Sequence, residues 1–406
     1  MDFRPEHFGG LLHLAHPRLL LWLDENLASV FKQDPGQDVC RHTELTEGGP
    51  SQRESLLGAP IEVHMNLSER CWTGCSHCYV DATPSGPVMN PARACRLLDL
   101  MADARVFHVA LGGGEPLDYP ALLEVAHHAR KRGIVPNLTT SGTGLNEKTA
   151  FRLTRVFGQI NVSLDVPPGQ GDSFRSDLHV AEQSLVMLRK YSKNVGINMV
   201  LSRKTFRQLN KIIALASKLG LGEVELLRLK PGGRASSIYE KERITASQGI
   251  ELLPRVLSLA IKYRTAIRMD CSLAPFIYYH RPNLDVLSFF NIRGCEAGNM
   301  LAGVDASGNL KACSFSPWIE GPAEHMLDFF GNKGAFTIFN ELEQTLGEPC
   351  ASCDYLELCR GGCRAVAYFL TGQASSPDPE CPVVLGLPSP YVSLKTAMIS
   401  WIGRSE

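Results

Sequence analysis

Six strand-like segments alternate with six helical segments between residues 61 and 264, and this alternation leaves few folds open to the chain. The strand-like segments read IEVHMNL, FHVALG, VPNLTT, INVSLD, GINMVL and EVELLRL, and the helical ones lie near 90–104, 119–132, 145–156, 179–193, 206–219 and 247–264. Strands joined by helical crossovers pair in parallel. The pattern therefore predicts a parallel sheet, open or barrel-like, with its chemistry at the carboxyl ends of the strands.

The bulk composition is that of an ordinary globular protein of two or three domains. Hydrophobic residues make up 44% of the 406 residues, charged residues make up 20%, and the net charge is -1. A balanced charge gives no general attraction to nucleic acid or to anionic membranes, so we expect neither as a partner. The amino terminus lacks a basic segment followed by an uninterrupted apolar run, which predicts a cytoplasmic protein.

Thirteen cysteines are the second strong constraint. Proteins of a reducing compartment seldom keep disulfides, so clustered cysteines there are better read as metal ligands or catalytic groups. Three of them, Cys71, Cys75 and Cys78, follow the first strand-like segment directly. A structural zinc needs four closed ligands, which His77 could complete, whereas three thiolates on a 4Fe-4S cluster leave one iron open to a ligand.

The stretch CWTGCSHCYV resembles the motif of the radical S-adenosylmethionine (SAM) superfamily, Cys-x3-Cys-x-aromatic-Cys after the first strand of a partial barrel. Cys71, Cys75 and Cys78 match the three cysteines, with His77 at the aromatic position and Tyr79 next to the last cysteine. The resemblance implies a TIM-like partial (β/α)6 barrel and a 4Fe-4S cluster whose open iron binds SAM. It also implies reductive cleavage of SAM to a 5'-deoxyadenosyl radical, with electrons from a donor such as flavodoxin or ferredoxin.

A glycine run follows the second strand-like segment. Gly113-Gly114-Glu115 matches the Gly-Gly-Glu motif of the same family. Glycines permit close approach of the backbone to a ligand, and a carboxylate can pair with the ammonium group of SAM. Alone, such a run is usually a turn, but its place one strand-helix unit after the cysteines favours the family assignment.

Four further residues are carried over as SAM contacts. Ser141 lies in TTSGTG after the third strand-like segment, Ser163 and Asp165 end the fourth, and Arg175 follows as a carboxylate partner. Strand-end capping explains the first three equally well. In LRLKPGGRA, at the end of the sixth segment, Arg228 or Arg234 would face the substrate, although a solvated arginine is the simpler interpretation.

Cysteine spacing after residue 290 resembles the SPASM extension of radical enzymes. Two auxiliary 4Fe-4S clusters are implied, the first on Cys295, Cys313 and Cys363, and the second on Cys350, Cys353, Cys359 and Cys381. A zinc ribbon would explain Cys350 and Cys353 but not the other spacings. Cys271 is either the fourth ligand of the first auxiliary cluster or a buried thiol.

The patterns described above predict that the chain has four parts. Residues 1–59 hold a short β-hairpin, a helical piece and a linker, residues 60–268 the barrel, residues 269–385 the cysteine-rich SPASM lobe, and residues 386–406 a tail. An exposed hairpin edge can bind a leader peptide by strand addition, but the hairpin could equally cover the open side of the barrel.

The resemblance implies an oxidoreductase that abstracts hydrogen from a substrate. The expected substrate is a ribosomally synthesised precursor peptide that acquires a carbon-carbon, thioether or cyclophane crosslink, with oxidation through the auxiliary clusters. Alternatives are small-molecule cofactor or tetrapyrrole biosynthesis, formylglycine formation on sulfatases, and a non-enzymatic scaffold. The sulfatase role is disfavoured because Ser314 follows Cys313 where an acidic residue is expected. No catalytic base is identified.

Overall fold

The computed structural model describes residues 2–6, 9–14, 19–23, 57–170, 174–289, 292–330, 336–340 and 345–388. The helical piece expected after the N-terminal hairpin, Cys40 and most of the C-terminal tail lie outside these ranges. Within them, no helix combines the length and the apolarity needed to cross a bilayer.

A ten-stranded sheet forms the centre of the molecule, and its six middle strands are the six predicted segments. They follow one another in space as they do in sequence, and neighbouring strands pair in parallel. The six are β4 (Glu62–Ser68), β5 (His108–Gly113), β6 (Val135–Thr140), β7 (Ile160–Ser163), β8 (Val195–Leu201) and β9 (Glu223–Arg228). The predicted parallel, barrel-like sheet is therefore confirmed.

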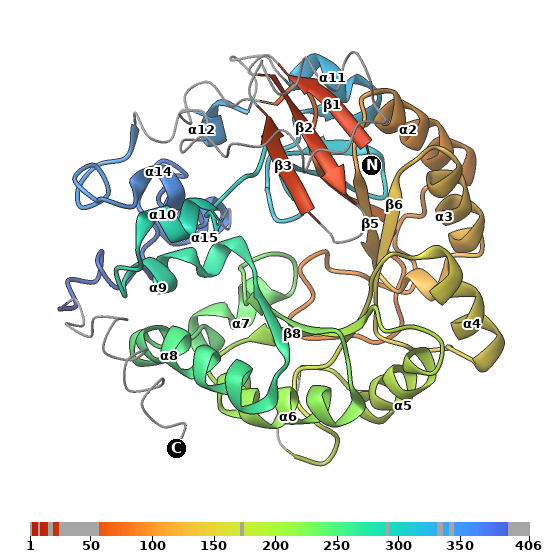
Figure 1. Cartoon of the computed structure of the whole chain (residues 1–406), viewed down its shortest axis with the longest axis horizontal. Coiled ribbons are helices and arrows are strands. Elements are labelled where there is room, and N and C mark those ends of the chain that lie inside the picture. The colour runs from red at the N-terminus through yellow and green to blue at the C-terminus, as the bar shows by residue number, and fades with distance from the viewer. Residues whose placement is uncertain are drawn as a thin grey trace, which may run out of the picture.

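Helices cover the outer face of this sheet as an arc around the strands (Figure 1). They are α2 (Pro91–Asp103), α3 (Leu122–Lys131), α4 (Glu147–Val156), α5 (Leu178–Arg189), α6 (Leu209–Leu219) and α8 (Ala246–Tyr263), with the short η3 (Pro116–Asp118) and η4 (Thr205–Gln208) before α3 and α6. One further helix, α7 (Ala235–Glu242), lies in a stretch without an expected element. The main hydrophobic core lies between the strands and these helices, and apolar side chains of both contribute to it.

Local sequence signals fix where these helices begin and end. The Asn90 side chain accepts a hydrogen bond from the backbone N–H of Ala92, and Pro91 is the first residue of α2. Thr245 and Gln248 form a capping box at the start of α8, which satisfies two backbone donors at once. Gly220 ends α6 with a φ of 62°, a conformation that glycine adopts without strain.

Side chains of β4 alternate between the main hydrophobic core and the opposite face of the sheet. Val63, Met65 and Leu67 are fully buried and belong to the main apolar core with the helices. Between them His64 and Asn66 occupy the opposite face of the strand, because side chains alternate across a sheet. Polar residues consequently line the concave side of the sheet.

The cysteine-rich lobe continues the same sheet. β10 (Ala266–Met269) pairs in parallel with β9, while β11 (Leu301–Val304) pairs in parallel with β4 and leads to β12 (Asn309–Lys311) and β13 (Gly321–Pro322). The lobe also contains η5 (Cys271–Leu273), α9 (Ala274–Tyr278), α10 (Leu284–Phe289), η6 (Ala323–His325), α11 (Met326–Phe329), α12 (Thr337–Asn340), α14 (Leu356–Cys359) and α15 (Arg364–Thr371). The lobe is thus hydrogen-bonded to the barrel through β11, while β10 extends the barrel at its other edge.

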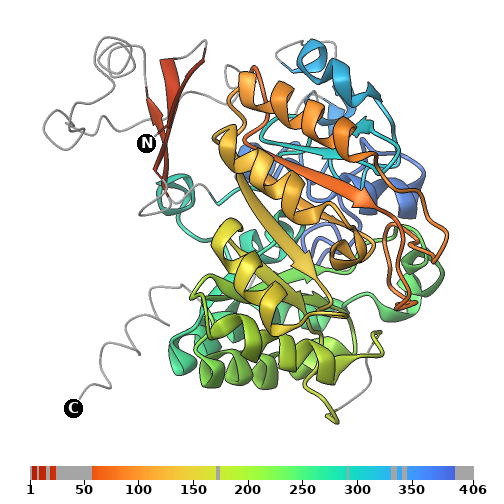
Figure 2. The same cartoon turned by 90° about the vertical axis from the view of Figure 1, so that its right-hand side faces the viewer.

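An antiparallel three-stranded sheet forms the N-terminal part. The predicted hairpin is β2 (Gly9–Leu14) with β3 (Leu19–Leu23), and β1 (Asp2–Glu6), which the sequence pattern did not indicate, pairs with β2 on the other side. This sheet stands beside the barrel (Figure 2). Leu11 packs against Leu57 and Phe107, just before the amino ends of β4 and β5.

Candidate functional site

The first cysteine loop lies at the carboxyl end of β4, where parallel sheets place their chemistry. Two hydrogen bonds hold its stem: the N–H of Cys71 donates to the Thr83 carbonyl at 3.0 Å, and the N–H of Thr83 donates to the Glu69 carbonyl at 3.1 Å. The N–H of Cys78 donates to the Cys75 carbonyl at 3.3 Å, so these two cysteines share one turn.

The three thiols of this loop are close enough to influence one another. Burial raises the pKa of Cys75, and the neighbouring Cys78 and Cys71 raise it further. The Cys78 sulfur accepts a hydrogen bond from the backbone N–H of Ala82 at 3.4 Å. A loop that brings three thiols together has the donor set of an iron–sulfur cluster with one open iron.

Gly113 and Gly114 pack against the backbone that leads into the cysteine loop. A Cβ on Gly114 would lie 2.1 Å from the Arg70 carbonyl oxygen, and one on Gly113, whose φ is 116°, would lie 2.1 Å from the Ser68 carbonyl oxygen. The N–H of Gly114 donates to the Ser68 carbonyl at 2.6 Å. In the structure these glycines therefore permit contact with the base of the cysteine loop; we expected close approach to a ligand.

Glu115 is buried, and its carboxylate accepts four hydrogen bonds from the protein. They come from the hydroxyl of Thr140 at 2.5 Å, the hydroxyl and N–H of Ser141 at 2.5 and 2.8 Å, and the N–H of Leu117 at 3.1 Å. Burial raises the pKa of Glu115, while these donors act in the opposite direction. The Glu115 carboxylate therefore holds the loop after β6. Ser141, a predicted SAM contact, donates hydrogen bonds to Glu115.

His77 occupies a buried position between charged groups. Its ring lies 4.9 Å from that of Phe174, and its Nε2 is 3.7 Å from an Asp165 oxygen. Burial and the nearby Arg175 charge lower the pKa of His77 to about 3, so the imidazole is neutral. Its Nδ1 has no hydrogen-bond partner among the residues that the structure describes. An unsatisfied buried polar atom beside the cysteine loop fits a cofactor that supplies the partner.

Asp165 and Arg175 pair directly. The Arg175 Nε donates to Asp165 at 2.9 Å, and the other Asp165 oxygen accepts the N–H of Val200 at 2.9 Å. Ser163 is buried at the end of β7, in the same region of the sheet. The predicted SAM contacts of this region are thus brought together on the carboxyl side of β7 and β8.

Arg234 is a residue of the site whose role the sequence did not indicate. We expected it to be solvated or to face substrate, but its Nε donates to the Cys75 carbonyl at 3.0 Å and its guanidinium also binds the Ala82 carbonyl and Asp81. Arg234 therefore joins the middle of the cysteine loop to the residues that follow its last cysteine. No local pattern could reveal this, because more than 150 residues separate Arg234 from its partners.

A polar cavity of about 320 Å³ lies beside the loop. Tyr79, which follows Cys78, and Ser314, which follows Cys313, both line it, so it borders the first cysteine loop and the cysteine-rich lobe together. The Tyr79 ring lies 4.4 Å from that of Phe315. The other lining residues are Asn66, Glu69, Val80, Gly233, Val304, Asp305 and Lys311.

Cys271 gathers with three cysteines of the lobe. Burial raises the pKa of Cys313 to about 12, and Cys295 and Cys363 raise it further. Burial also raises the pKa of Cys271, with contributions from Asp270, Cys295 and Cys363. These mutual electrostatic effects indicate that the four thiols lie near one another, and four thiol donors suit a cluster with four protein ligands.

The remaining four cysteines form a separate group. Burial raises the pKa of Cys350 to about 11, and Cys381 and Cys353 add to the effect. The pKa of Cys359 is raised by burial and by Cys381, Cys350 and Cys353. Within the described ranges no three His, Cys, Asp or Glu side chains stand close enough to hold a single metal ion. Four partly buried thiols that influence one another again match the donors of an iron–sulfur cluster.

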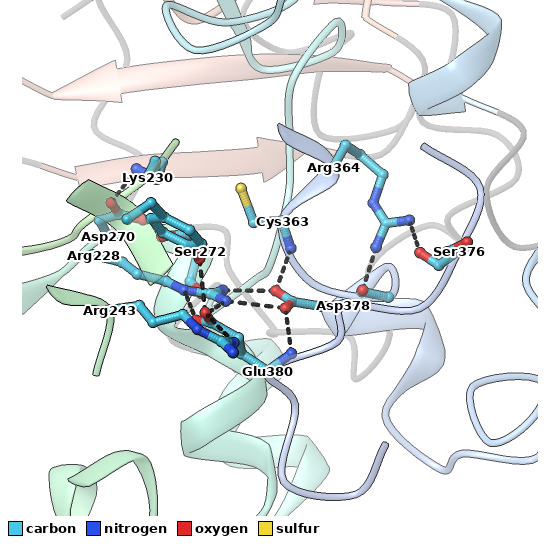
Figure 3. Close-up of polar contacts among 12 residues, drawn as sticks. Arg228, Lys230, Arg243, Asp270, Ser272, Cys363, Arg364, Ser376, Asp378 and Glu380 are labelled. Carbon is cyan, nitrogen blue, oxygen red and sulfur yellow. Dashed lines mark hydrogen bonds and ion pairs between the residues drawn. The ribbon is translucent and has the colours of Figure 1, made fainter. Parts of the chain in front are cut away.

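Arg228 joins the barrel to the lobe through buried ion pairs (Figure 3). Its guanidinium binds Asp378 at 2.6 Å and Glu380 at 2.6 Å, and also donates to the Ser272 carbonyl at 2.9 Å. Asp378 in turn accepts the N–H of Cys363 at 3.0 Å. The expectation that Arg228 is solvated or faces substrate was wrong, since its side chain is 1% exposed.

Two more residues complete this network on the barrel side. The Tyr239 hydroxyl donates to Glu380 at 2.8 Å, and Arg243 binds the same oxygen at 3.1 Å from a partly exposed position. Glu380 immediately precedes Cys381. The network thus reaches a cysteine of each lobe group, Cys363 and Cys381.

Comparison with known proteins agrees with this geometry. Residues 65–216 match the model of the radical SAM superfamily. The chain is 28% identical over 340 residues to mycofactocin maturase MftC of Mycobacterium tuberculosis, covering 81% of this chain and 85% of that protein. It is 26% identical to PqqA peptide cyclase of Bradyrhizobium diazoefficiens, with 80% and 87% covered, and 24% identical to AdoMet-dependent heme synthase of Methanosarcina barkeri, with 80% and 97% covered.

Among solved structures the fold resembles Streptococcus suis SuiB. The SuiB structure bound to S-adenosylmethionine has a TM-score of 0.71 and 17% identity, covering 93% of this chain and 98% of that one. A SuiB structure bound to the precursor peptide SuiA also has a TM-score of 0.71, with 16% identity and the same coverage. Likeness at this identity concerns the fold.

Proposed function

Residues 65–216 of this chain form a radical SAM domain, and we propose that the whole chain is a maturase that modifies a ribosomally synthesised precursor peptide. The observation that carries the proposal is the cavity that borders both the first cysteine loop and the cysteine-rich lobe. The peptide class is supported by the relatives MftC and PqqA peptide cyclase and by SuiB, whose structure holds its precursor peptide.

Cys71, Cys75 and Cys78 hold the 4Fe-4S cluster that binds SAM. Cluster and SAM together supply a carbon-centred radical that abstracts hydrogen from the substrate. Around them the chain orients and shields: Arg234 fixes the cysteine loop, and His77 presents its neutral, unpaired Nδ1 to the bound cofactor. Fixed geometry and exclusion of water are what the protein contributes to such chemistry.

Two auxiliary clusters complete the assignment. Cys271, Cys295, Cys313 and Cys363 hold the first, and the proximity of Cys271 to the other three supports its role as the fourth ligand. Cys350, Cys353, Cys359 and Cys381 hold the second. Clusters held there would serve as acceptors for the electron released when the product forms, and a small cytoplasmic donor such as flavodoxin or ferredoxin would supply the reducing electron.

The N-terminal sheet offers a place for the leader peptide. In the described part of the chain the outer edge of β3 pairs with no other strand, so its backbone groups can accept an added strand. Deleting residues 1–50 should abolish binding of the precursor peptide while iron content stays unchanged. Binding that persists in the truncated protein would contradict a recognition role for this sheet.

Iron counting and SAM cleavage test the enzyme assignment. We expect about twelve irons per chain after anaerobic reconstitution, and about eight in a Cys71/Cys75/Cys78→Ala variant, which should form no 5'-deoxyadenosine. Cys95→Ala is the matched control, because Cys95 lies on α2 outside the three groups and should change neither result. Bound zinc without SAM cleavage in the wild type would refute the radical assignment.

Substrate class is decided by incubation with a synthetic copy of a short peptide encoded beside this gene. A maturase should convert SAM to 5'-deoxyadenosine and change the mass of the peptide by loss of hydrogen. The runner-up is small-molecule or tetrapyrrole chemistry, which the heme synthase relative favours. In that case the peptide mass stays constant while a porphyrin precursor is converted.

A further inference from the structure

Lys230 is a buried cation just past the end of β9. Its ammonium group donates to the Asp270 carboxylate, and it lies 4.1 Å from the centre of the Phe315 ring. Asp270 is buried too, and its other oxygen accepts the N–H of Ser272 at 2.5 Å. Figure 3 shows this pair beside the Arg228 network. Both charges are therefore held in fixed positions inside the protein.

The pair lies against the first lobe group of cysteines. Asp270 directly precedes Cys271, and Phe315 follows Cys313 by two residues. The Lys230 charge also acts on Cys363, for which it is the strongest electrostatic influence of any neighbouring residue, and on Cys271 and Cys313. The Lys230 charge therefore acts electrostatically on three of the four thiols of the group.

A purely structural explanation of this pair is weak. Burying two charges is expensive, and a buried ion pair often stabilises a fold no more than well-packed apolar residues would. Arg228 already ties the end of β9 to this segment through the Ser272 carbonyl. Lys230 is also absent from the cavity lining, so it does not reach the space that the substrate would occupy.

We propose that the Lys230–Asp270 pair sets the reduction potential of the cluster held by Cys271, Cys295, Cys313 and Cys363. This inference rests on the auxiliary cluster of the proposed function. One-electron reduction makes the cluster more negative by one charge, so a fixed cation nearby favours the reduced form and a fixed anion opposes it. The two members of the pair act in opposite directions, and their balance tunes the electron acceptor.

The test uses redox titrations followed by electron paramagnetic resonance on the full chain. The background is Cys71/Cys75/Cys78→Ala, so that both auxiliary signals are observed without the third cluster. Lys230→Gln should shift one signal to a more negative potential, and Asp270→Asn should shift the same signal to a more positive one. Each shift should correspond to about a tenfold change in the reduction equilibrium, or about 59 mV.

Lys190 and Glu147 provide the matched control. They form an exposed ion pair on the barrel helices, and Lys190→Gln and Glu147→Gln change the net charge by the same amounts. Both should leave the two potentials unchanged. The second auxiliary signal is an internal control, since neither Lys230→Gln nor Asp270→Asn should move it.

Each remaining outcome has a definite meaning. If the Cys71/Cys75/Cys78→Ala background shows no auxiliary signal, the auxiliary clusters of the proposed function are refuted, and the inference with them. If the signals are present and neither variant moves them, or both move one signal in the same direction, the inference is overturned. Loss of that cluster in both single variants would also overturn it, because the pair would then serve assembly. The double variant should return the potential toward that of the background.

Discussion

Gly112 and Gly114, two residues apart, differ in whether the structure leaves room for a side chain. A Cβ at position 114 would collide with the Arg70 carbonyl, whereas a Cβ at Gly112 meets no atom within 4 Å. We predict that Gly114→Ala displaces the cysteine loop and lowers the iron content by about four atoms, the number in one cluster. Gly112→Ala should retain full iron. Equal iron content in the two variants would contradict this account of the motif.

Glu115 supports the site through acceptors that only a carboxylate supplies. In Glu115→Gln one oxygen becomes an amide N–H₂, which cannot accept from its present donors, Ser141 among them. An unsatisfied buried group costs about 1–3 kcal/mol. We therefore expect SAM affinity to fall about tenfold or more, as measured by equilibrium dialysis. Glu124→Gln, on the exposed side of α3, should not alter it.

Residue roles could be predicted where chemistry and spacing coincide, and not where contacts are distant. The three cysteines of the first loop and Glu115 carry recognisable spacing. Arg228, however, meets its carboxylate partners 150 and 152 positions later, and an arginine at a strand end looks the same in sequence whether it is solvated or buried. Only the fold decides between these environments.

Elements follow the same division. The six parallel strands, of four to seven residues, alternate with helices whose apolar faces repeat every three to four residues, and this alternation makes both visible in sequence. The lobe strands β11, β12 and β13 contain two to four residues and follow one another without such helices. They form because they extend an existing sheet edge, and sequence patterns do not record that edge.

Docking of the N-terminal sheet depends on a buried arginine of β1. Arg4 donates to the Pro60 carbonyl at 2.9 Å and pairs with Glu6 at 2.8 Å. Arg4→Ala leaves the Glu6 carboxylate buried without that partner, at a cost of about 1–3 kcal/mol. We expect limited proteolysis ahead of Leu57 to become about tenfold faster, with iron content unchanged. Arg132→Ala, at an exposed ion pair, should leave the rate as in wild type.

At the scale of the whole molecule, a shared sheet and a buried ion-pair network join the barrel to the lobe. Arg228 lies at the junction with buried carboxylates on the lobe side. Removing one partner of a buried ion pair costs about 3–5 kcal/mol, so Arg228→Met should lower the free energy of unfolding by that amount in anaerobic urea titrations and reduce lobe iron. Arg243→Met touches the same Glu380 from a partly exposed position and should cost less than about 1 kcal/mol. Similar losses in both variants would contradict the assignment.

The N-terminal sheet packs near the amino ends of β4 and β5, while the cysteine loop stands at the carboxyl end of β4. A strand of seven residues spans about 23 Å. If β3 binds a leader peptide as proposed, the peptide would have to span this distance before one of its carbons reaches the cavity. An extended chain covers about 3.3–3.6 Å per residue. The proposed binding mode would thus require at least roughly seven residues between the bound segment of a substrate and its first modified position.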